Sequence, residues 1–195
     1  YGNEYPFLSW MSRLGLATDG SANGVTVLKQ GWGVEPLTEG QAACVSTMSY
    51  NEYWVVRDAG YTPEQLTVFK YQAEGASTLE DGLYVLEKNL GDDSFKDKMV
   101  RFVRASMKGW KYAEANPKEA ASIILDNDDA GVQTEKHQIR MMGEIAKLTA
   151  GSNGSLDPSD YERTVKVLMS GASDPVITKE PSGAWTHDIT NAALN

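Results

Sequence analysis

Short runs of β-branched and aromatic residues alternate with helical patterns in the first part of the chain. Residues 25–28, 42–46 and 66–71 are apolar runs of strand length, whereas residues 4–14 and 48–58 carry apolar side chains at helical spacing. Strands that alternate with helices are typical of a parallel sheet covered by helices. The pattern therefore predicts an α/β fold for this part of the chain.

From about residue 92 the pattern becomes mostly helical. Residues 94–115 and 134–149 place apolar side chains at three- and four-residue steps, and one further strand is predicted at 83–86. Asn116-Pro117 and Asp157-Pro158 each combine a capping side chain with a proline suited to the first helical position. We therefore expect a helical layer here, followed by a loop from residue 170 to the end.

The best candidate for a boundary between the two patterns is the stretch 74–81, which contains Gly75, Ala76 and Ser77. We therefore predict one domain over residues 1–80 and a second, mostly helical one over residues 81–195.

Charge and hydropathy argue against two classes of partner. The net charge is −9, and the parts before and after residue 80 are both acidic, at −5 and −4. A chain without a basic stripe cannot release counterions from a nucleic-acid backbone, so we expect no nucleic-acid binding. The longest near-apolar runs, such as residues 120–125, are far shorter than the ~20 residues that a membrane-spanning helix needs. We therefore expect no direct membrane insertion.

The motifs of common enzymes are missing from the sequence. It contains no Gly-x-Ser-x-Gly, no Gly-x-Gly-x-x-Gly and no phosphate-binding loop. His137 and His187 have no nucleophile or metal ligand beside them, and we interpret both as surface or helix-packing side chains. Cys44 is the single cysteine, which we interpret as a small buried apolar residue. The sequence thus predicts no catalytic residue, no metal and no cofactor.

The stretch Tyr50-Asn51-Glu52-Tyr53-Trp54 is the strongest candidate for a binding site. It places three aromatic rings, one amide and one carboxylate at the start of a predicted helix that follows an apolar strand. In open parallel sheets, ligands bind beyond the carboxyl ends of the strands, beside such helix starts. The alternative is that Tyr53 and Trp54 are core residues and that Glu52 only complements the helix dipole. Gly2-Asn3-Glu4-Tyr5 repeats the same chemistry at another helix start.

Three segments resemble one family of proteins. They are residues 48–53 (Met-Ser-Tyr-Asn-Glu-Tyr), residues 79–84 (Leu-Glu-Asp-Gly-Leu-Tyr) and residues 102–113, which contain Arg-Ala-Ser-Met-Lys-Gly-Trp. They are similar to segments of the periplasmic solute-binding proteins of ABC transporters that bind thiamine pyrimidine precursors and are related to sulfonate and nitrate binders. The resemblance runs over nearly the whole chain and ends near Trp185.

The resemblance implies a type II periplasmic-binding-protein architecture, in which two α/β lobes enclose a ligand cleft. Residues 1–80 would belong to the second lobe, without its first strand, and residues 81–195 would return to the first lobe. The architecture would be partial, because members of the family are longer than this chain. A periplasmic location is also implied, although no signal-peptide pattern is present and the chain starts at Tyr1 without Met. We therefore expect a processed, truncated or partly covered protein.

By the same resemblance, residues at two helix starts face the ligand: Asn3, Glu4, Tyr5, Tyr50, Asn51 and Glu52. The carboxylates of Glu4 and Glu52 would repel a sulfonate or a nitrate and would favour an amine or a protonated heterocycle.

The expected function is capture of a small nitrogen-containing heterocycle, such as a thiamine pyrimidine precursor, for delivery to the membrane permease of an ABC transporter. Three alternatives stay open. The same fold could bind another small solute such as a sulfonate, nitrate or flavin, it could be a ligand-sensing input domain, or it could be a thiamine-pyrimidine biosynthetic enzyme. The resemblance disfavours the enzyme, because the related enzymes use a cysteine-rich iron site that Cys44 alone cannot supply.

Overall fold

The computed structural model describes residues 4–170 and 175–194. The chain divides into two compact units, each built from separate stretches, and we describe each unit by itself. The first unit consists of Tyr1–Thr47, Val55–Gly82 and Leu156–Ala184. The second consists of Met48–Trp54, Leu83–Ser155 and Trp185–Asn195. The domains predicted over residues 1–80 and 81–195 stay a prediction.

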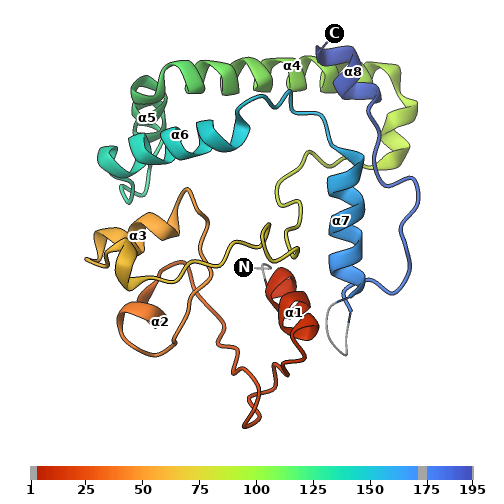
Figure 1. Ribbon diagram of the computed structural model, residues 1–195. Coiled ribbons are helices and arrows are strands. Elements are labelled where there is room, and N and C mark those ends of the chain that lie inside the picture. The colour runs from red at the N-terminus through yellow and green to blue at the C-terminus, as the bar shows by residue number, and fades with distance from the viewer. Residues whose placement is uncertain (1–3, 171–174, 195) are drawn as a thin grey trace. The chain divides into compact units, whose positions relative to one another are not determined.

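Helices form the regular structure of the described residues. The helices are α1 (Glu4–Arg13), α2 (Glu35–Thr38), α3 (Glu52–Asp58), η1 (Pro63–Gln65), η2 (Glu87–Gly91), α4 (Asp93–Ala115), α5 (Pro117–Asp126), α6 (Glu135–Thr149), α7 (Pro158–Met169) and α8 (Asp188–Leu194), as Figure 1 shows.

The predicted helix starts at the two Asx-Pro pairs are confirmed, but only one of them uses its capping side chain. The Asp157 carboxylate accepts the backbone N–H of Ser159 at 2.8 Å and so caps α7. Asn116 makes no capping hydrogen bond, and its amide donates instead to the carbonyl oxygen of Tyr112 at 3.0 Å. The start of α5 therefore rests on Pro117 and on tertiary packing.

The predicted α/β fold is wrong. Within residues 4–170 and 175–194 no strand forms, and the stretches predicted as strands (25–28, 42–46, 66–71 and 83–86) are irregular or turns. A type II periplasmic-binding architecture built on parallel sheets is therefore not what the described chain adopts. The loop predicted after residue 170 also needs correction, because the short helix α8 lies within it.

The strand predictions failed because a β-propensity describes one segment, whereas a strand needs a second backbone beside it. Gln30 takes the place of such a neighbour for Ser46. Its amide nitrogen donates to the Ser46 carbonyl at 2.9 Å, and its amide oxygen accepts the Ser46 N–H at 3.1 Å. A side chain thus satisfies the backbone groups that a strand ladder would otherwise pair.

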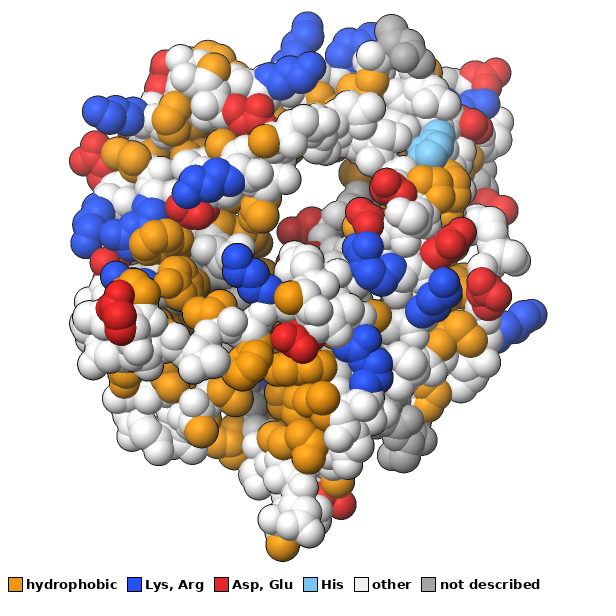
Figure 2. Space-filling model, viewed as in Figure 1, with side chains coloured by type: hydrophobic (Ala, Val, Ile, Leu, Met, Phe, Trp, Pro, Cys, Tyr) orange, Lys and Arg blue, Asp and Glu red, His pale blue; other side chains and the backbone are white. Residues whose placement is uncertain are grey.

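Several apolar side chains of the expected strands lie at the surface. Phe69 is 60% exposed and Leu86 is 64% exposed, although both stand in runs that predicted buried strands. Apolar side chains are visible on the face of the molecule shown in Figure 2. Cys44, expected to be buried, is exposed as well. In the stretches expected to be strands, local hydrophobicity therefore did not predict burial.

In the first unit, α1 and α7 pack together and hold the segment 74–79 with their side chains. Arg13 of α1 donates to the carbonyl oxygen of Gly75 at 3.1 Å. Arg163 of α7 donates to the carbonyl oxygen of Ser77 at 3.2 Å. The polar groups of this irregular segment are thus satisfied by helix side chains.

In the second unit, α4 lies beside α8, and α5 lies beside α6 (Figure 1). Arg104 of α4 donates to the carbonyl oxygens of Ala192 and Ala193 at 3.0 and 3.1 Å. These are among the last carbonyls of α8, which no intrahelical donor can reach. The seven residues of α8 are too few for a stable isolated helix, so its formation depends on this contact with α4.

We expect the substitution Asp157→Ala to destabilise the protein in a pH-dependent way. Hydrogen bonds from the side chain and the backbone of Ser159 hold the pKa of Asp157 below its ordinary value of 3.8. Because the folded-state pKa is depressed, the stabilisation is present above that value and is lost as the pH falls through the folded pKa. Urea titrations of both proteins should show a difference in the free energy of unfolding at neutral pH that shrinks on acidification. Asp129→Ala, at an exposed position that caps no helix, should show neither effect.

Candidate functional site

Asn51 and Glu52, two of the predicted ligand residues, form one hydrogen-bonded group at the start of α3. The Glu52 carboxylate accepts the backbone N–H of Met48 at 2.8 Å through one oxygen. Its other oxygen accepts the amide N–H of Asn51 at 3.0 Å. Glu52 therefore fixes the turn that precedes the helix and sets the direction in which the Asn51 amide points.

His137 of α6 completes this group. Its Nε2 lies 2.8 Å from Oδ1 of Asn51. Because the Asn51 nitrogen already faces a carboxylate, its oxygen faces the imidazole, so Nε2 donates this hydrogen bond. The chain of contacts from Glu52 through Asn51 thus orients the ring of His137.

A hollow of about 370 Å³ lies beside Asn51 in the second unit. Amides, one carboxylate and two apolar side chains surround it: Asn51, Ile124, Asn127, Asp128, Gln133, Gln138 and Met141. The segment that joins α5 to α6 and the first turns of α6 contribute most of this lining. The hollow is therefore polar, with an apolar contribution from Ile124 and Met141.

Hydrogen bonds fix the orientation of several lining groups. Gln138, only 4% exposed, donates from its amide to the amide oxygen of Gln133 at 2.5 Å. The backbone N–H of Gln133 donates to one oxygen of Asp128 at 2.7 Å, and the Asn127 amide donates to the carbonyl of Ile123 at 2.7 Å.

Some polar atoms of the hollow remain unused by the described residues. They are the amide nitrogen of Gln133, the amide oxygens of Asn127 and Gln138, and the second oxygen of Asp128. The hollow therefore offers both hydrogen-bond donors and acceptors to a small molecule.

An aromatic cluster stands next to the Asn51 group. The rings of Tyr53 and Trp54 meet edge to face, with centroids 5.3 Å apart. The guanidinium of Arg140 lies 4.8 Å from the centroid of the Trp54 ring, a cation–π distance. Because Arg140 follows His137 by three residues, one face of α6 contacts both Asn51 and Trp54.

The predicted ligand residues are distributed over the two units. Tyr50, Asn51 and Glu52 belong to the second unit, whereas Glu4 and Tyr5 start α1 in the first. Glu4 is exposed, Tyr5 is half-buried, and Asn3 lies outside the described residues. A ligand-binding role for these six positions stays a prediction.

Sequence reasoning missed Asp128, Gln133, His137 and Gln138. The acidic stretch around Asp128 was interpreted as a helix-end turn, and His137 as a surface or helix-packing side chain. The contact between His137 and Asn51 joins residues 86 positions apart. No local pattern reports such a contact, so the sequence alone carried no signal for it.

Among the described residues, no group of three or more His, Cys, Asp and Glu side chains could hold a metal ion. No helix formed by residues 4–170 and 175–194 is long and apolar enough to cross a lipid bilayer.

Comparison with known proteins identifies a family. A family model described as NMT1/THI5 like matches residues 9–120, which is more than half of the 195 residues. The matched region contains Asn51 and Glu52 and ends before His137. Searches of curated proteins and of solved structures found no match.

We expect Gln138→Glu to lower the free energy of unfolding by about 1–3 kcal/mol, because it replaces a buried donor by an acceptor that faces the Gln133 oxygen. Urea titrations at neutral pH measure this loss. The loss should shrink on acidification, because a protonated glutamate regains a donor. Gln72→Glu, the same change at an exposed turn residue, is the matched control. An equal loss in both variants would show that the buried amide contributes nothing specific.

Proposed function

Because the chain belongs to the NMT1/THI5-like family, we propose that it is the solute-binding component of a bacterial ABC uptake system. Family membership suggests binding of a small solute. The finer proposal is that the solute is a small nitrogen-containing heterocycle, of the kind that serves as a thiamine pyrimidine precursor. On this proposal the protein works in the periplasm, delivers its ligand to a membrane permease and catalyses no reaction.

The observation that carries the proposal is the set of unused polar atoms in the hollow beside Asn51. An amino-substituted heterocycle has N–H donors on its amino group and acceptor nitrogens in its ring. The amide oxygens of Asn127 and Gln138 and the free oxygen of Asp128 suit the donors. The amide nitrogen of Gln133 suits a ring nitrogen. The polar groups are therefore of the types that such a ligand pairs with.

The predicted ligand residues take specific roles in this proposal. Asn51 keeps one N–H that does not face Glu52 and presents it to the ligand, while Glu52 holds the amide in place. Tyr50 supplies a ring for stacking. For Asn3, Glu4 and Tyr5, at the other predicted helix start, a ligand-binding role is part of the proposal by their chemistry alone: polar side chains that form hydrogen bonds and a ring that can stack.

Charge favours a neutral or cationic ligand over an anion. Asp128 is the charged side chain that lines the hollow, and the Glu52 carboxylate is hydrogen-bonded to Asn51, another lining residue. Carboxylates would repel a sulfonate or a nitrate and would stabilise an amino group or a protonated ring.

Calorimetric titration of the full chain with 4-aminopyrimidine, a flavin, taurine and nitrate tests the proposed ligand class. We expect saturable binding of the aminopyrimidine and none of taurine or nitrate, because the hollow combines amides with a carboxylate. Affinity for taurine or nitrate without affinity for the heterocycle would exclude the proposed ligand.

A matched pair of variants tests the proposed site. Asp128→Asn keeps the shape and one acceptor but removes the charge, and it should weaken binding of the aminopyrimidine by about ten-fold or more. Asp129→Asn makes the same change one residue away at an exposed position outside the lining, and it should leave the affinity unchanged within about two-fold. If both variants lose affinity equally, the effect is one of net charge and the ligand binds elsewhere.

A further inference from the structure

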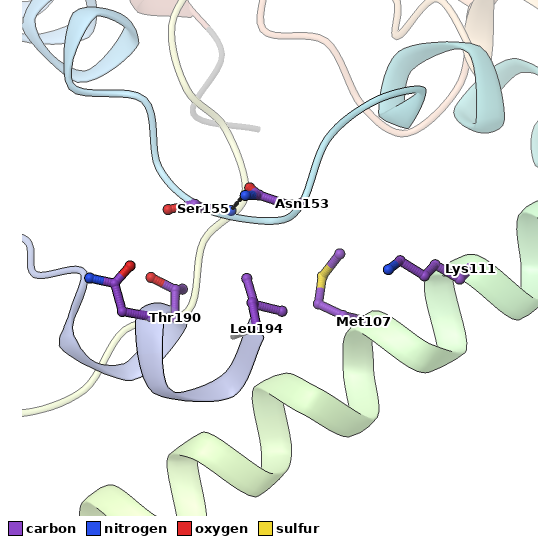
Figure 3. Close-up of a pocket in the computed structure, with 7 residues that line it drawn as sticks. Met107, Lys111, Asn153, Ser155, Thr190 and Leu194 are labelled. Atoms are coloured by element: carbon purple, nitrogen blue, oxygen red, sulfur yellow. Dashed lines mark hydrogen bonds between the residues drawn. The ribbon is translucent and has the colours of Figure 1, made fainter.

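A second pocket in the second unit shares no lining residue with the hollow beside Asn51. It lies between α4, α8 and the turn at residues 153–155, and its volume is about 140 Å³. One cation, several hydroxyl and amide groups and two apolar side chains line it: Met107, Lys111, Asn153, Ser155, Thr190, Asn191 and Leu194 (Figure 3).

The turn that forms one wall is pressed onto α4. Gly154 has a φ of +78°, and a Cβ at this position would lie 2.5 Å from the sulfur of Met107. The positive φ favours glycine at this position, whereas the contact is with the end of a flexible methionine side chain. The Asn153 side-chain oxygen accepts the Ser155 N–H at 2.9 Å, shown as a dashed line in Figure 3, which fixes the turn and points the Asn153 amide.

Hydrogen bonds also fix the opposite wall of the pocket, which α8 forms. Arg104 binds the last carbonyls of α8 and so fixes this helix against α4. The Thr190 hydroxyl donates to the carbonyl oxygen of His187 at 3.1 Å. The pocket is therefore formed by elements that are already tied together within one unit.

Lys111 gives this pocket a positive charge that no described residue neutralises. The part of α4 from Arg101 to Lys111 contains four cations and no carboxylate, although the chain as a whole carries a net charge of −9. Arg101 pairs with Asp97 at 3.0 Å, and Arg104 binds carbonyls. Lys111, in contrast, has no hydrogen bond or ion pair with any of the described residues.

The geometry points to a second ligand site, for a small organic carboxylate. The ammonium of Lys111 and the N–H and O–H donors of Asn153, Ser155 and Asn191 suit the carboxylate oxygens. Met107 and Leu194 lie between these polar groups in Figure 3 and suit a short aliphatic chain. This second site has the opposite charge to the hollow beside Asn51, so the two select different ligands.

An NMR titration of the ¹⁵N-labelled chain with sodium butyrate, at an ionic strength held constant with sodium chloride, tests this site. We expect saturable shifts of the backbone amides of Ser155, Thr190 and Leu194. Acetate should bind several-fold more weakly, because each buried methylene group contributes favourably.

Variants of two lysines on the same helix supply the control. Lys111→Gln should weaken butyrate binding by about ten-fold, because it removes a charge-assisted contact. Lys108→Gln makes the same change outside the lining and should leave the affinity within about two-fold. Leu194→Ser provides a second variant, which should reduce the preference for butyrate over acetate.

Three results would overturn the inference. The first is the absence of saturable shifts with butyrate. The second is an equal loss of affinity in the two lysine variants, which would reflect only the net charge of α4. The third is inorganic phosphate shifting the same amides as strongly as butyrate, which would show that the apolar side chains make no contribution.

Discussion

Hydrogen bonds from side chains to the backbone hold irregular segments and one short helix of this protein in place. Gln30 pairs with both backbone groups of Ser46, Arg13 binds the carbonyl of Gly75, and Arg104 binds the last carbonyls of α8. Three of these hydrogen bonds are exposed and one is partly buried, so each replaces a contact with water and contributes modestly to stability. In the described residues, which contain no sheet, they fix the path of the backbone where no strand ladder does.

Side-chain contacts of the same kind also position the residues of the candidate site. His137 and Arg140 stand on one face of α6, and Gln138 and Met141 stand on the next face, each pair three residues apart. The first pair contacts Asn51 and Trp54, and the second lines the hollow. One helix thus orients the predicted ligand amide and supplies part of the cavity beside it, so the site depends on the register of α6.

The sequence predicted the positions of the helices far better than it predicted which segments would pack or pair with one another. Helix starts could be predicted at Asp157-Pro158 and Asn116-Pro117 because capping and the fixed φ of proline are local effects. The strand at 66–71 was predicted from β-branched and aromatic residues, whose preference for extended backbone carries no information about a neighbouring strand.

The difference between local and long-range information also explains which residues of the candidate site could be predicted. Asn51 and Glu52 are adjacent, so a local pattern could single them out. His137 lies 86 positions away from Asn51, and its role depends wholly on how α6 packs. The apolar runs at residues 42–46 and 83–86 suggested buried strands because apolar side chains favour burial. Their hydrophobicity does not specify which surface would cover them.

Charge distinguishes the two cavities of the second unit. Asp128 is the ionised group in the hollow beside Asn51, and Lys111 is the ionised group in the pocket between α4 and α8. Each carries one net charge among amide groups that can act as donors or acceptors. Amides tolerate either sign of ligand charge, so the single ionised side chain decides which ligand is excluded. An anion that fits beside Lys111 is therefore repelled beside Asp128, and within this unit two polar cavities can coexist without competing for the same solute.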